Sequence, residues 1–200
     1  MEMISRLRWI IIAFFVLLFL ILIGWGLSSI ARSIFSSDAP ENIQEAEEIS
    51  AAVQETDVAR FTTSGPVVAS REQRSYTIEV NPNVVTITLY SDYGQKELDQ
   101  KSYRNNQEAF DVFLKSLDAA GVSTRISGTN SEDDLLYEGQ CATGRRYVVA
   151  LDSDLVRWSV SCDTVSGTIK KSSMSTIRRL FNNQVPDARE FLEDTNLYAN

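Results

Sequence analysis

Residues 9–31 form a run of 23 residues without a charged side chain, bounded by Arg8 and Arg32. Ile, Leu, Phe and Val make up most of this run. A helix of this length spans about 34 Å, slightly more than the roughly 30 Å hydrocarbon core of a bilayer. Trp9 and Trp25 lie near its ends, where indole rings favour the boundary between lipid and water. The run therefore predicts a transmembrane helix that has the lipid bilayer as its partner.

The charges that flank the run predict its orientation. Arg6 and Arg8 precede it closely, whereas Arg32 is followed by an acidic stretch. Because basic flanks stay on the cytoplasmic side, we expect residues 1–8 in the cytoplasm and the remaining chain outside the cell membrane. A cleaved signal peptide is the alternative, since Ser29-Ile30-Ala31 loosely fits a cleavage site. The run is longer than the apolar region of about 7–15 residues in such peptides, which favours an uncleaved anchor.

The rest of the chain divides into a predicted stalk, residues 32–65, and a predicted extracytoplasmic domain, residues 66–200. Residues 38–60 contain seven acids and one base, and their apolar side chains form only a narrow helical stripe. The sequence Thr-Thr-Ser-Gly-Pro at 62–66 is typical of a flexible break. The whole chain has a formal net charge of −8 and no long basic stripe, which argues against nucleic acid as a partner.

Residues 66–200 alternate between strand-like and helix-like apolar patterns. The first passage contains two alternating strands near 76–80 and 85–89 and a weaker strand near 95–103. It ends with a helix that is capped by Asn105 and stopped by Gly121. A second passage has predicted strands near 135–141, 147–151 and 156–162, a short extension at 167–169, a helix from about Ser173 to Pro186, and a last short helix. We therefore predict an α+β domain of two antiparallel β-meanders, each followed by a helix, with Trp158 in the core.

The two cysteines of the chain, Cys141 and Cys162, lie in the second passage. An even number of cysteines in an extracytoplasmic domain predicts a disulfide, and two separate buried thiols are the alternative. In a simple meander the two cysteines would lie two strand spacings apart, about 9.6 Å. Bridged Cα atoms are rarely more than about 7 Å apart. A bridge therefore requires the turn at Cys141 to curl over the middle strand, or a different strand order.

The chain contains no histidine, which excludes Ser-His-Asp and Cys-His catalysis and imidazole-dependent zinc sites. It also has no Walker loop and no glycine-rich dinucleotide motif, so we predict no cofactor, no metal site and no catalytic residue. Carboxylate chemistry stays open, because paired acids can hydrolyse glycosides. The acids considered for that role are Glu132, Asp133, Asp134 and Glu138, although a solvated loop explains them more simply.

Six basic residues lie close to the two cysteines in the sequence. A disulfide would bring their segments together and create a local anion-binding patch on an acidic protein. Scattered solubilising charge is the alternative. The candidates are Arg145, Arg146, Lys170, Lys171, Arg178 and Arg179.

The segments at 141–147 and 158–162 resemble short stretches of uncharacterised single-span envelope proteins of small-genome bacteria, and this resemblance implies no known activity. With the predicted anchor, it leads us to expect a membrane-anchored interaction or structural module of the cell envelope. Its expected partner is an envelope protein or a cell-wall polymer, and we do not expect an enzyme. The alternative function is a tethered or secreted envelope hydrolase that uses carboxylates.

Overall fold

The computed structural model describes residues 49–126, 141–152, 155–163, 167–195 and 197. The chain divides into two compact units, Met1–Glu45 and Ala46–Asn200, and all described residues belong to the second. The predicted cytoplasmic N-terminus, transmembrane helix and first part of the stalk lie outside the described residues. Among the residues that are described, no helix has the length and apolarity needed to cross a membrane.

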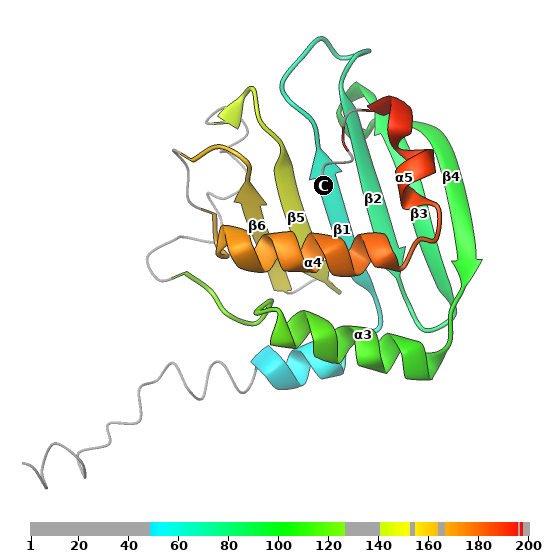
Figure 1. Cartoon of the computed structure of the whole chain (residues 1–200), viewed down its shortest axis with the longest axis vertical. Coiled ribbons are helices and arrows are strands. Elements are labelled where there is room, and N and C mark those ends of the chain that lie inside the picture. The colour runs from blue at the N-terminus through cyan, green and yellow to red at the C-terminus, as the bar shows by residue number, and fades with distance from the viewer. Residues whose placement is uncertain (1–48, 127–140, 153–154, 164–166, 196, 198–200) are drawn as a thin grey trace, which may run out of the picture. The chain divides into compact units, whose positions relative to one another are not determined.

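Six antiparallel strands form one sheet in the order β4-β3-β2-β1-β5-β6 (Figure 1). The strands are β1 (Ala59–Ser64), β2 (Arg74–Val80), β3 (Val84–Ser91), β4 (Lys96–Arg104), β5 (Arg146–Leu151) and β6 (Leu155–Val160). The α+β class is confirmed, but the predicted meanders are two parts of one continuous sheet. The strand predicted near 135–141 lies outside the described residues except for Cys141, which begins a turn closed by a 3.0 Å hydrogen bond from the Gly144 amide.

Strand β1 joins the two parts of the sheet, because it pairs with β2 on one side and β5 on the other. Ala59 and Phe61 are fully buried. The sequence prediction assigned this segment to the stalk, so the predicted domain boundary at residue 65 is too late. The physical reason is that a central strand needs only one apolar face when helices cover that face and polar side chains occupy the other. β1 has apolar Ala59 and Phe61 on the covered face, and its other side chains are polar.

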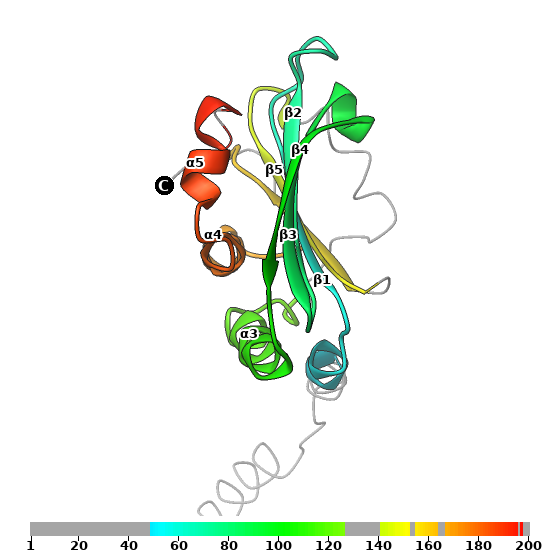
Figure 2. The same cartoon turned by 90° about the vertical axis from the view of Figure 1, so that its right-hand side faces the viewer.

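The helices α3 (Gln107–Ala119), α4 (Lys171–Asn183) and α5 (Ala188–Phe191) lie against one face of the sheet (Figure 2). The structure also describes two short 3-10 helices, η1 (Asp92–Gly94) and η3 (Glu193–Thr195), and a helical segment at 49–54. The N-cap of α3 is Asn106, whose side chain accepts a 2.9 Å hydrogen bond from the Ala109 amide. Asn105, the predicted cap, instead donates its side-chain amide to the Asn81 carbonyl at 2.7 Å.

The apolar faces of both long helices form the main core with the covered face of the sheet. Phe181 of α4 lies at the centre of this core. Its ring stacks on Phe61 of β1 at a centroid distance of 5.3 Å and meets the Phe113 ring of α3 edge-on at 5.0 Å. One side chain therefore contacts the sheet and the other long helix at once. The remaining buried side chains of these helices are Phe110, Leu114, Leu117, Met174 and Ile177.

A polar cluster connects the outer strand β4 to the start of α5. Lys101 donates to the Asp187 carboxylate at 2.6 Å, and the Tyr103 hydroxyl donates to the other oxygen of the same carboxylate. These two hydrogen bonds hold the pKa of Asp187 below its usual range, and the bond from Lys101 has the larger effect. Burial, and then the bond to Asp187, raises the pKa of Tyr103 to about 12. The cluster holds the C-terminal helices against the edge of the sheet.

Candidate functional site

The face of the sheet opposite the helices is rich in hydroxyl groups. Thr62, Thr77 and Thr88 are adjacent in register across β1, β2 and β3, and Ser64, Ser75 and Tyr90 form the next row. This arrangement follows from strand geometry, because successive side chains point to opposite faces and apolar residues alternate with these polar ones. The Thr62 and Thr77 hydroxyls hydrogen-bond each other at 3.0 Å, whereas no described residue hydrogen-bonds the side chains of Ser64, Ser75 or Tyr90.

A cavity of about 410 Å³ lies over this face. The polar side chains of β1, β2, β3 and β5 line it, among them those of Ser64, Ser75, Tyr90 and Arg146. Residues of the β1–β2 loop and η1 line a second side, and the turn at Cys141 lines the third. Ser75 is 5% exposed as a residue, and it lines the cavity. Its hydroxyl can donate one hydrogen bond to a ligand and accept others from it.

Hydrogen bonds hold the β1–β2 loop against η1. The Tyr93 hydroxyl donates to the Val68 carbonyl at 2.7 Å. The Tyr93 amide donates at 2.9 Å to the side-chain oxygen of Gln73, which is 2% exposed. Asp92 and Tyr93 adopt left-handed φ angles of 54° and 57°, which cost about 1–2 kcal/mol each outside glycine. The hydrogen bonds offset this cost, so specific contacts fix the backbone of the β1–β2 loop and η1 on this side of the cavity.

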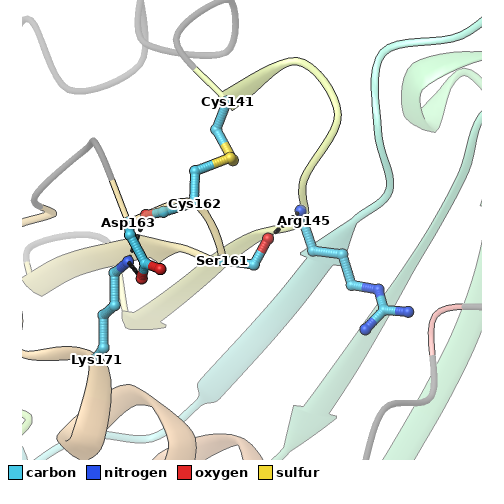
Figure 3. Close-up of a disulfide and its surroundings, with 6 residues drawn as sticks. All are labelled: Cys141, Arg145, Ser161, Cys162, Asp163 and Lys171. Carbon is cyan, nitrogen blue, oxygen red and sulfur yellow. Dashed lines mark hydrogen bonds and ion pairs between the residues drawn. A yellow bond between two sulfur atoms is a disulfide. The ribbon is translucent and has the colours of Figure 1, made fainter.

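Cys141, which also lines the cavity, is bonded to Cys162. This disulfide confirms the predicted bridge, with its Cα atoms 5.8 Å apart (Figure 3). The strand order resolves the geometric conflict noted above. The neighbours of β5 are β1 and β6, so Cys141 precedes β5 and Cys162 follows the adjacent strand β6. The bridge therefore joins the ends of two neighbouring strands. Cys141, Trp158 and Val160 form a small second core beside it, so Trp158 is buried as predicted.

Gly144 allows the turn to pack tightly on the disulfide. A Cβ atom at this position would lie 2.3 Å from the Cys141 sulfur and 2.8 Å from the Cys162 sulfur. Any larger residue would displace the bridge or the turn. The Arg145 amide donates to the Ser161 hydroxyl at 2.8 Å, and its side chain points away from the disulfide (Figure 3). These contacts position the start of β5, and with it Arg146.

The six basic candidates are distributed over different surfaces. Arg146 lines the cavity, and Lys171 lies beside the disulfide, where it pairs with Asp163 at 3.0 Å. Arg178 projects toward the helix-covered side, where its guanidinium lies 5.4 Å from the centre of the Tyr147 ring. Lys170 and Arg179 are exposed at α4 and its N-cap. The structure thus brings Arg146 to the cavity and places Arg178 on the opposite side of the sheet.

The acidic candidates Glu132, Asp133, Asp134 and Glu138 lie outside the described residues. None of the described residues that line the cavity is acidic. In the described ranges, no group of three or more His, Cys, Asp or Glu side chains is arranged to hold a metal ion. The polar groups that the described lining presents are hydroxyls, the Gln73 side-chain amide and the Arg146 guanidinium, and they support hydrogen bonding.

Sequence reasoning did not identify Ser64, Ser75, Tyr90 and Tyr93 as site residues. The available signal was the alternation of hydroxyl and apolar residues at 74–91, which predicted strands but gave no indication that their polar faces meet β1. The comparisons with known proteins add no assignment: no protein-family model, no curated protein and no solved structure matches this chain.

Proposed function

We propose that this chain is a membrane-tethered binding module of the cell envelope, with the cavity on the polar sheet face as its ligand site. The observation that carries this proposal is the row of hydroxyls of Ser64, Ser75 and Tyr90, which lines the cavity and has no side-chain hydrogen-bond partner among the described residues. The cavity volume of about 410 Å³ falls in the range of small-molecule sites. The apolar run at 9–31 supports the tether.

The lining favours binding over hydrolysis. A glycoside hydrolase needs two carboxylates that converge on the scissile bond. The part of the lining that the structure describes offers hydroxyls, one amide, one guanidinium and a few apolar side chains, and no carboxylate. Hydroxyls that are fixed on strands suit recognition, because a rigid sheet holds them in place before the ligand arrives.

Filling the cavity is expected to abolish ligand binding. The variant Ser75→Phe places a ring in the cavity, whereas Ser102→Phe makes the same change on exposed β4, outside the cavity. A panel of several hundred small polar compounds, screened by ligand-observed NMR against the full-length chain in detergent micelles, should contain binders. Those binders should be lost with Ser75→Phe and kept with Ser102→Phe.

Thermal unfolding of both variants controls for folding. If Ser75→Phe fails to fold, Tyr90→Phe replaces it, since that change removes one cavity hydroxyl with little change of volume. If no compound in the panel loses binding in a cavity variant, the binding proposal is wrong. Hydrolysis of a glycan by the unmodified chain, abolished by substituting a single acid, would replace it with the hydrolase alternative.

The tether proposal predicts a specific membrane topology. Protease added to intact spheroplasts should remove the domain that contains β1 to β6 and leave residues 1–31 in the membrane, because Arg6 and Arg8 keep the N-terminus inside. The disulfide supports an oxidising compartment for the domain. Full protection of the domain would contradict this orientation, and its release without protease would indicate a cleaved signal peptide.

A further inference from the structure

We infer that the Cys141–Cys162 disulfide regulates binding at this cavity: the oxidised chain holds the cavity in its binding shape, and reduction of the bridge by a dithiol weakens binding. The inference rests on the proposed binding function and concerns the regulation of the same site. It depends on where the bridge lies relative to the lining, on how closely one turn packs against it, and on what else holds that turn.

The bridge is part of the structure that surrounds the cavity. Cys141 and Gly144, at the two ends of one turn, both line the cavity. Val160 at the end of β6 also lines it and packs with Cys141 in the small second core, which Cys162 borders. The bridge therefore joins the turn on one side of the cavity to the end of β6 (Figure 3). A change in the bridge acts on the lining directly, without a relay through the main core.

Gly144 makes the position of the turn depend on the state of the bridge. It packs against both sulfur atoms so closely that there is no room for a Cβ atom. Bonded sulfur atoms lie about 2 Å apart, whereas heavy atoms that are not bonded need about 3.5–4 Å. The sulfurs must therefore separate when the bond is reduced, and they cannot separate toward Gly144 without displacing the turn. Reduction thus moves a segment that contributes to the lining.

Hydrogen bonds also connect the turn to its surroundings. The Val67 amide donates to the Ala142 carbonyl at 2.7 Å. The Arg145 amide donates to the Ser161 hydroxyl at 2.8 Å. The first of these bonds ties the turn to the β1–β2 loop, and Val67 itself lines the cavity. A displaced turn would therefore release the Val67 amide, and two sides of the cavity would lose this connection.

The reductant in this inference is a dithiol. Its thiolate attacks the sulfur of Cys162, which is partly exposed, whereas Cys141 is buried. The disulfide bond breaks, Cys141 leaves as a thiolate that takes up a proton, and a mixed disulfide forms at Cys162. The second thiol of the reductant attacks its own sulfur in the mixed disulfide and releases the Cys162 thiolate, which is also protonated. The chain gains two electrons and two protons, and the reductant becomes a cyclic disulfide.

The movement of the turn is tested on the full-length chain in detergent micelles by hydrogen exchange with mass spectrometry, with and without dithiothreitol. Reduction should speed exchange in the peptides that contain the Val67 and Gly144 amides by about tenfold or more, because their hydrogen bonds open with the turn. Helix α3 should exchange as slowly as before, which distinguishes a local change from unfolding. The double variant Cys141→Ser/Cys162→Ser should exchange quickly in the same peptides with or without dithiothreitol. Unchanged exchange at both amides after reduction would contradict the inference.

The effect on binding is tested with the compounds of the panel whose binding is lost with Ser75→Phe. Each compound is titrated by NMR against the oxidised chain, the reduced chain and the double cysteine variant. We expect binding to the last two to be at least about fivefold weaker, at the lower end of the usual couplings between sites. In a buffer of reduced and oxidised dithiothreitol, the same compounds should shift the equilibrium toward the disulfide by the same factor, because such coupling is reciprocal.

Ile177→Ala is the control for a general loss of stability. Ile177 is 0% exposed on α4 and is not among the described residues that line the cavity, so its truncation destabilises the domain from the helix-covered side. Binding of the same compounds should stay within about twofold of that of the unmodified chain, because distant sites act independently.

The outcomes separate this inference from the proposed function. If the compounds bind the oxidised and the reduced chain equally, the inference is wrong and the binding site remains. The same conclusion follows if Ile177→Ala weakens binding as much as reduction does, because loss of stability would then explain both effects. If no compound of the panel depends on the cavity, the proposed function is wrong and the inference with it.

Discussion

Replacing Phe181 with alanine is expected to destabilise the domain by about 3–5 kcal/mol, the usual cost of truncating a fully buried phenylalanine. Phe181 is 0% exposed and contacts Phe61 of the sheet and Phe113 of α3. The void left by the alanine would lie between β1, α3 and α4, so the surrounding side chains could relax into it only slightly. The unfolding temperature of the full-length chain in detergent, followed by circular dichroism, should fall by more than about 6 °C.

Val112→Ala provides the control for this change. Val112 lies on α3 but is 59% exposed, so its truncation should change the free energy of unfolding by no more than about 0.5 kcal/mol. Equal shifts in the two variants would mean that α4 does not pack on the sheet as described.

Removal of the disulfide is expected to lower the free energy of unfolding by about 3 kcal/mol, because the bridge closes a loop with a sequence separation of 21. For a domain of this size the unfolding temperature should fall by roughly 6–12 °C. The measurement compares the unmodified chain, with and without reductant, with the double variant Cys141→Ser/Cys162→Ser.

Reductant should lower the unfolding temperature of the unmodified chain and leave that of the double variant unchanged. Mass spectrometry of the unreduced protein should show one linked pair of peptides. Two thiols that alkylate freely in protein from the oxidising compartment would contradict the bridge and would argue against the proposed external location of the domain.

Local patterns were sufficient to predict most individual elements. The alternation at 76–80 and 85–89 identified β2 and β3, and the helical spacing of apolar residues identified α3 and α4 with the correct buried faces. These signals depend on neighbours within a few residues, because each strand or helix presents one apolar face to the core. The paired cysteines likewise predicted the disulfide from their number and setting.

The assembly of these elements depended on β1, which the sequence did not reveal. β1 is short, and Thr62, Thr63 and Ser64 precede a glycine and a proline, a composition typical of a loop. Its partners are far away in the chain, because β5 begins at Arg146. The cavity was missed for the same reason, since its hydroxyl rows form only when β1, β2 and β3 are placed in register. Of the basic candidates, Arg146 lines the cavity, whereas Arg178 lies on the opposite side of the sheet. Spacing in the sequence cannot show this separation.

The central place of β1 also determines how the domain would bear mechanical load. β1 is the first of the described strands, so tension applied from the N-terminal side enters the sheet between β2 and β5. β1 is antiparallel to both neighbours, with six residue pairs on each side. A pull along the strand would therefore shear two hydrogen-bonded ladders together, whereas an edge strand pulled outward would lose its bonds one at a time. The order of the strands thus makes β1 a mechanically strong point of entry for such a load.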